Sequence, residues 1–223
     1  TPCGTLFPYT TLFRSGAHLT PGGRVAVVTV DGVIALIDRA DGALAGSFDI
    51  PAETGFVPPA GGAQQVPIPA GLEAKLVEHV GPLCAEELAL VLGASTGSSG
   101  AFSDNTLAVA APGRIYVIGG GPTPEVGALV AVDLDETGDV PAMELAWWTP
   151  VEEASATSPA VSPSGHRVVV GSNAGELLYL DVERCDANED DDANGERCAP
   201  AWTWPILGRP LLGSVAVDEH GRV

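Results

Sequence analysis

A repeated pattern is the feature that most constrains the fold of this chain. In each copy a glycine-containing turn is followed by an arginine, an apolar strand, a second turn, and another apolar strand that ends in aspartate. The arginines are Arg24, Arg114, Arg167 and Arg222, so the steps between them are 90, 53 and 55 residues. Because the copies consist of short strands and turns, the repeat predicts antiparallel β-structure.

The individual copies can be read directly from the sequence. The clearest runs from Ser158 and reads SPAVSPSGHRVVVGSNAGELLYLDV. A second reads LAVAAPGRIYVIGG and continues with GALVAVD, and a third begins at Gly23 and ends at Asp38. A fourth begins in GSVAVDEHGRV. Gly and Asp-Gly turns between strands of about five to six residues predict β-hairpins in each copy.

The wide first step has two interpretations, a degenerate repeat or an insertion with its own structure. Leu72, Leu76 and Val80 have helical spacing, and Cys84, Leu88, Val91 and Leu92 continue it after Gly81-Pro82. We therefore expect a small helical insertion over about residues 70–94. Residues 51–69 are rich in proline and glycine and predict an irregular loop.

The order SPAVSPSG, VVVGS, GELLYLD and tryptophan resembles the PQQ-type β-propeller repeat, most clearly over residues 103–223 and less clearly over 20–50. The resemblance implies an all-β fold, a partial β-propeller of three to four blades spanning residues 16–223. Blades of about 40 to 50 residues agree with the shorter steps, and a closed propeller has about four to eight blades. The sequence is therefore interpreted as a propeller fragment.

The first fifteen residues are treated separately. Residues 5–15, TLFPYTTLFRS, resemble the translation of a sequencing adapter, with a natural edge strand as the alternative. We expect residues 1–15 not to belong to the natural protein and leave them out of the fold argument.

The composition limits the classes of partner. The chain has 10 Lys and Arg against 29 Asp and Glu, a formal charge of -19. Such a surface repels phosphate backbones, so no nucleic acid partner is expected. Hydrophobic residues make up 45% of the chain, enough for a core, and no apolar run reaches the length of a transmembrane helix.

Two cysteines bracket an acidic segment, CDANEDDDANGERC, between two predicted strands. In an oxidising compartment a Cys185–Cys198 disulfide would stabilise the fold by about 3 kcal/mol. Two free thiols in a cytosolic loop are the alternative. A zinc site is disfavoured because no second Cys or His lies nearby at ligand spacing.

The same segment contains D-x-D-x-N-G, the first half of a calcium-binding loop. The bidentate glutamate of a full EF-hand is missing, because Ala201 occupies its position. The candidate oxygen ligands for calcium are therefore Asp186, Asn188, Asp190, Asp192, Asn194 and Glu196. A solvated acidic loop is the alternative interpretation. Bound calcium would stiffen the loop rather than catalyse a reaction.

Catalytic patterns are weak in this sequence. The chain has no G-x-S-x-G motif, and its four histidines are far apart in the sequence. Gly119-Gly120-Gly121 is interpreted as a hairpin turn rather than a dinucleotide site. Trp147-Trp148 and Trp202-x-Trp204 are interpreted as packing between blades, with stacking on a sugar or planar cofactor as the alternative. The recurring Asp38, Asp133 and Asp181 are expected to have structural roles in turns.

The resemblance also bears on function. Quinoprotein dehydrogenases with this repeat carry a vicinal Cys-Cys pair, calcium ligands and a catalytic aspartate, and this sequence contains no Cys-Cys. We therefore expect no PQQ here and favour a non-enzymatic scaffold of an exported cell-envelope protein that binds protein or peptide partners. The alternatives are a fragment of a PQQ-dependent alcohol or sugar dehydrogenase, and a carbohydrate-binding surface propeller.

Overall fold

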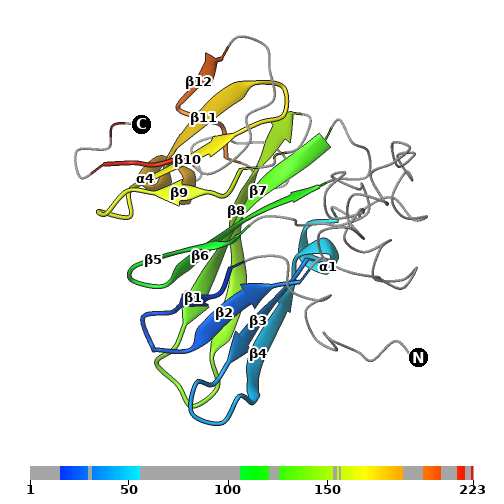
Figure 1. The fold of residues 1–223 in the computed structure, drawn as a ribbon, viewed down its shortest axis with the longest axis vertical. Coiled ribbons are helices and arrows are strands. Elements are labelled where there is room, and N and C mark those ends of the chain that lie inside the picture. Colours follow the sequence, from blue (N-terminus) through cyan, green and yellow to red (C-terminus); the bar gives the residue numbers. More distant parts are fainter. Residues whose placement is uncertain are drawn as a thin grey trace, which may run out of the picture.

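The repeated strands form three four-stranded antiparallel sheets that lie against one another face to face (Figure 1). The computed structural model describes residues 16–29, 32–55, 106–120, 126–152, 155, 157–187, 198–206, 215–218 and 222. The expected helical insertion at 70–94 and the adapter-like residues 1–15 lie outside these ranges. The three sheets confirm the all-β fold and the partial propeller.

Each sheet contains four strands in sequence order. The first sheet consists of β1 (His18–Leu19), β2 (Val25–Val28), β3 (Val33–Ile37) and β4 (Leu44–Asp49). The second consists of β5 (Ala108–Ala110), β6 (Arg114–Gly120), β7 (Val126–Asp135) and β8 (Ala142–Glu152). The third consists of β9 (Ala160–Val161), β10 (Arg167–Gly171), β11 (Glu176–Asp181) and β12 (Trp202–Pro205).

The strand register explains why arginine and aspartate recur together. Arg114 lies opposite Asp133 in the pairing of β6 with β7, and Arg167 lies opposite Asp181 in the pairing of β10 with β11. The repeat therefore places a cation and an anion on neighbouring strands at the same end of each of these hairpins. Opposite charges at such cross-strand positions attract one another.

The turns of the first and third hairpins use glycine in the same way. Gly32 and Gly175 precede the second strands of their hairpins and have φ angles of 86° and 84°. This left-handed region strains any residue with a side chain, which is why glycine recurs there. In both turns a backbone N–H just after the first strand donates to a backbone carbonyl at the start of the second strand. The N–H of Thr29 donates to the carbonyl of Val33 at 2.9 Å, and the N–H of Ser172 donates to the carbonyl of Glu176 at 2.8 Å.

Two short helices follow strands. Helix α1 (Ile50–Thr54) follows β4, and α4 (Val182–Asp186) follows β11. Each is preceded by an aspartate in extended conformation, Asp49 or Asp181, whose side chain accepts a backbone N–H of the first turn. This is the usual N-cap arrangement, and it gives Asp181 the structural role expected from the repeat.

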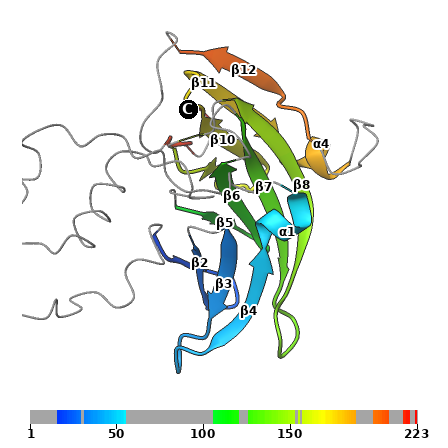
Figure 2. The same ribbon diagram turned by 90° about the vertical axis from the view of Figure 1, so that its right-hand side faces the viewer.

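The second sheet is buried on both faces because it lies between the other two (Figures 1 and 2). Along β7, Ala128 and Val130 point into the core shared with the first sheet, whereas Leu129 and Ala131 point into the core shared with the third. Successive side chains of a strand face opposite sides. A strand buried on both sides must therefore be apolar at every position, as GALVAV is.

Polar contacts join the three sheets along their first strands. β1 lies against β5, and β5 lies against β9. The backbone N–H of Gly16 donates to Thr106 Oγ1 at 3.1 Å, and the backbone N–H of Thr106 donates to Ser158 Oγ at 3.2 Å. Each of these three residues precedes the first strand of its sheet. Residues at the same position of successive repeats are therefore linked by hydrogen bonds across the described part of the propeller.

Candidate functional site

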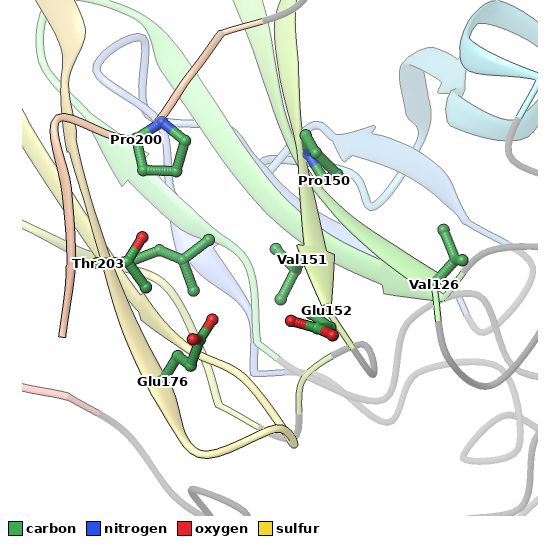
Figure 3. A pocket seen from close by; sticks show the side chains of 8 residues that line it. Val126, Pro150, Val151, Glu152, Glu176, Pro200 and Thr203 are labelled. Atoms are coloured by element: carbon green, nitrogen blue, oxygen red, sulfur yellow. The ribbon is translucent and has the colours of Figure 1, made fainter. Parts of the chain in front are cut away.

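An open cleft of about 350 Å³ lies between the second and third sheets (Figure 3). Its walls come from β8 and the start of β7 on one side, and from β11, β12 and the segment before β12 on the other. The lining residues are Val126, Pro150, Val151, Glu152, Glu176, Leu178, Pro200 and Thr203. A cleft of this size is within the range of ligand sites, about 300 to 1,000 Å³.

The inner wall of the cleft is part of the protein core. Val151 and Leu178 are 1% and 4% exposed, and both belong to the apolar cluster between the second and third sheets. Alternation along each strand places them there and turns their neighbours elsewhere. The cleft is therefore an opening onto a packed interface, and its base is apolar.

Two glutamates stand at the mouth of the cleft. Glu152 ends β8 and Glu176 begins β11, and their carboxylates point toward one another across the gap (Figure 3). Glu152 is exposed and Glu176 is half-buried. Within the described part of the chain, neither carboxylate has a hydrogen-bond or ion-pair partner. Sequence reasoning missed both residues, because their strands come from different repeats and only the packing brings them together.

Strand β12 contributes to the cleft with one face and exposes tryptophans on the other. Thr203 lines the cleft and lies opposite Leu178 in the strand register. Trp202 and Trp204 alternate with it and are 40% and 65% exposed. Trp202 stacks on Tyr179 with ring centroids 4.7 Å apart. The predicted packing of these two tryptophans between blades is not seen among the described residues.

The other tryptophan pair does pack between sheets, as predicted. Trp147 is 2% exposed and belongs to the core between the second and third sheets. Trp148, its neighbour on β8, is partly buried against the core between the first and second sheets. Consecutive residues of a strand face opposite sides, so the pair fills both interfaces of the middle sheet.

Cys185 and Cys198 form a disulfide that joins α4 to the segment before β12. Both cysteines are buried in the core between the second and third sheets. The backbone N–H of Cys198 also donates to the carbonyl of Trp148 at 2.8 Å. The disulfide thus closes the acidic segment on itself and fixes its two ends against the second sheet.

Of the six candidate calcium ligands, the structure describes only Asp186. Its Oδ1 accepts hydrogen bonds from Arg114 Nη1 at 2.7 Å and Trp147 Nε1 at 3.0 Å. Asn188, Asp190, Asp192, Asn194 and Glu196 lie outside the described residues, so calcium binding stays a prediction. In the described ranges no group of three His, Cys, Asp or Glu side chains is arranged to hold a metal ion.

The contacts of Arg114 connect the second sheet to the third. Its guanidinium bonds Asp133 in its own hairpin at 2.6 Å and Asp186, at the end of α4 in the next repeat, at 2.7 Å. Burial alone would lower the pKa of Arg114, but the hydrogen bonds to the two carboxylates outweigh it and raise that pKa. Burial also raises the pKa of the nearby Tyr116 phenol, so both groups keep their protons at neutral pH.

Arg24 occupies the same repeat position and connects the first sheet to the second. Its Nη1 donates to Glu136 Oε1 at 3.0 Å, and Glu136 also accepts from Thr20 Oγ1 at 2.9 Å and the Gly22 N–H at 2.7 Å. Burial opposes ionisation of Glu136, but these three donors outweigh it and lower its pKa. The repeat identified the arginines, whereas Glu136 follows β7 with no sequence signal of its own.

The remaining sequence candidates have structural surroundings. The Asp38 carboxylate accepts the Ala40 N–H at 2.8 Å in the turn after β3. Gly119 and Gly120 end β6 and pair with β7, so these two glycines lie in a strand rather than in the expected hairpin turn. His166 lies in the turn before β10 with its side chain 58% exposed, 3.0 Å from a Glu183 oxygen. Among the helices described, none is long and apolar enough to cross a membrane.

Comparison with solved structures identifies the fold. The β-propeller domain of Cps50 (Swd1) from Myceliophteria thermophila superposes with a TM-score of 0.51 at 13% identity, over 92% of this chain and 45% of that one. BamB from Moraxella catarrhalis gives a TM-score of 0.42 at 13% identity, over 86% and 38%. Sqt1 from Chaetomium thermophilum, solved with the N-terminus of ribosomal protein L10, gives 0.42 at 12%, over 83% and 37%.

The superposition on the Cps50 (Swd1) propeller supports a β-propeller fold and no more, because the sequence identity is only 13%. The chain spans less than half the length of each of these propellers. A search against protein families finds no match to this sequence, and a search of curated proteins finds no relative. The function must therefore be argued from the surface that the three sheets present.

Proposed function

We propose that this chain is a propeller scaffold that binds protein partners at the cleft between the second and third sheets and along β12. The observation that carries the proposal is the exposure of Trp202 and Trp204 on the strand whose other face lines the cleft. Exposed tryptophan on a rigid strand is typical of binding hot spots. The edge position of β12 in its sheet adds unpaired backbone groups for a partner.

We further propose that the protein acts outside the cytoplasm, in the cell envelope. The Cys185–Cys198 bond supports this, because disulfides persist in oxidising compartments and are rare in the cytosol. The large negative charge does not argue for either side of a membrane. Fractionation of the native host, followed by non-reducing peptide mapping, is the direct test of compartment.

Selection from a displayed library of random peptides tests the scaffold proposal. We expect enriched peptides whose affinity for the full chain falls at least about tenfold in Trp204→Ala, since a hot-spot tryptophan contributes that much or more. Val140→Ala is the matched control, because Val140 is also highly exposed, at 75%, but lies on the β7–β8 turn. No enrichment, or equal binding by both variants, would contradict the proposal.

Carbohydrate binding is a second candidate, favoured by the same exposed rings. Sugar rings stack on flat aromatic surfaces, and Trp202 with Tyr179 offers one. A glycan array separates the two functions. Binding that is lost in Trp202→Ala while folding is retained, together with no peptide enrichment, would favour the carbohydrate function.

A further inference from the structure

We propose that the cleft receives an arginine or lysine side chain from a partner peptide. The side chain would lie with its charge between Glu152 and Glu176 and its stem along the apolar base. The inference rests on the proposed scaffold function and names the chemistry of the partner. It follows from the charge, the lining and the position of the cleft.

Among the described residues, the charge of the cleft is uncompensated. Two carboxylates face one another across it, and like charges repel. The chain has few cations of its own, 10 against 29 acids. Arg24, Arg114 and Arg222 are paired with other carboxylates. A cation from outside would remove the repulsion and make hydrogen bonds to both glutamates.

The lining also favours a cation that is carried on an apolar stem. Val151 and Leu178 make an apolar base, and Pro150 and Pro200 have no backbone N–H to donate. Among the described lining residues, the hydroxyl of Thr203 is the one side-chain donor. A ligand for such a site must supply donors at one end and apolar surface along its length. Arginine and lysine do so, because a charged head follows an aliphatic stem.

The position of the cleft favours a peptide as the carrier of that side chain. β8 and β12 flank the cleft, and each is the edge strand of its sheet. An extended segment can lie in the gap between these edges while one side chain enters. A calcium ion suits the site less well, because it takes about six to eight oxygen ligands and the cleft lining contains two carboxylates and one hydroxyl.

Peptide titration tests the inference. The probe is a capped, fluorescent peptide of alternating serine and leucine with one central arginine, compared with the same peptide carrying neutral citrulline. We expect the full chain to bind the arginine peptide about tenfold more tightly, and Glu152→Gln/Glu176→Gln to abolish that preference. Binding should weaken as salt is raised. Both substituted residues lie at the cleft mouth, so circular dichroism of the double variant should show an unchanged fold.

Glu144→Gln is the matched control, because Glu144 is an exposed glutamate on the same strand, β8, outside the cleft. It should leave the preference for arginine intact. Equal binding of the arginine and citrulline peptides, or an equal loss in the control, would overturn the inference. So would saturable binding of calcium alone that the double variant removes. Enrichment of uncharged library peptides that need Trp204 would overturn the cation site and leave the scaffold function standing.

Discussion

The two junctions between neighbouring sheets use the same arginine of the repeat in different ways. At the first junction, Arg24 meets Glu136, whose side chain is 9% exposed and accepts three hydrogen bonds. At the second, Arg114 meets Asp133 and Asp186, whose side chains are 54% and 43% exposed. The second junction also has a disulfide close to Asp186.

The difference shows what the repeat does and does not specify. At these two junctions it supplies an arginine that reaches an acid of the following repeat. It does not specify where that acid comes from, since Glu136 follows β7 and Asp186 ends the short helix after β11. The first junction therefore depends on the charge of one largely buried carboxylate, that of Glu136. The second depends on a disulfide that holds Asp186 in place.

Removing the disulfide should have the largest effect and should act on the second junction alone. Its cysteines are separated by 13 residues. On the chain-entropy model, a loop of this size contributes about 3 kcal/mol. We expect Cys185→Ser/Cys198→Ser to lower the free energy of unfolding in urea by about that amount.

Reductant provides the control for this prediction. It should destabilise the wild-type chain to the level of the double variant and leave the double variant unchanged. If non-reducing mass analysis of exported protein found free thiols at both positions, the disulfide and the contrast between the junctions would both be contradicted.

Glu136→Gln should have the next largest effect, at the first junction. The folded state lowers the pKa of Glu136 below its usual value of 4.5, so its contribution is present above that value and is lost as the pH falls through the folded pKa. The variant loses the charge of an acceptor that receives three hydrogen bonds. This should lower the free energy of unfolding by about 2 kcal/mol at neutral pH. The wild type and the variant should converge as the pH falls through the folded pKa of Glu136.

Urea unfolding at several pH values measures this effect. Glu144→Gln is again the control, since the Glu144 side chain is exposed, and its stability should track the wild type throughout. A Glu136→Gln variant with a constant deficit at every pH would mean that the charge is not what stabilises the first junction.

The sequence predicted the central part of each sheet and missed its outer part. The hairpins around Arg114 and Arg167 were readable because glycine turns and alternating apolar residues recur at fixed positions. The outer strands β8 and β12 follow after linkers of different length, and β8 contains Pro150, which disfavours a strand assignment from sequence. An edge strand accommodates that proline because it needs to pair on one side only.

The candidate site was predictable only in part. Cys185 and Cys198 were found because two cysteines bracket one loop between strands. Glu152 and Glu176 are ordinary charged residues in sequence, and their importance comes from the packing of two sheets whose strands are distant in the chain. Asp186 was assigned to a calcium loop from its neighbours, and that assignment stays a prediction; the contacts of its Oδ1 with Arg114 and Trp147 could not be read from the sequence.

A double-mutant cycle tests most directly the claim that the repeated arginine connects successive sheets. We predict a coupling free energy of about 1 kcal/mol or more for Arg24→Gln with Glu136→Gln. The coupling should be smaller for Arg114→Gln with Asp186→Asn, because the Asp186 carboxylate is more exposed. It should be about zero for the crossed pair, Arg24→Gln with Asp186→Asn. Couplings near zero for both matched pairs, or equal for matched and crossed pairs, would contradict the account.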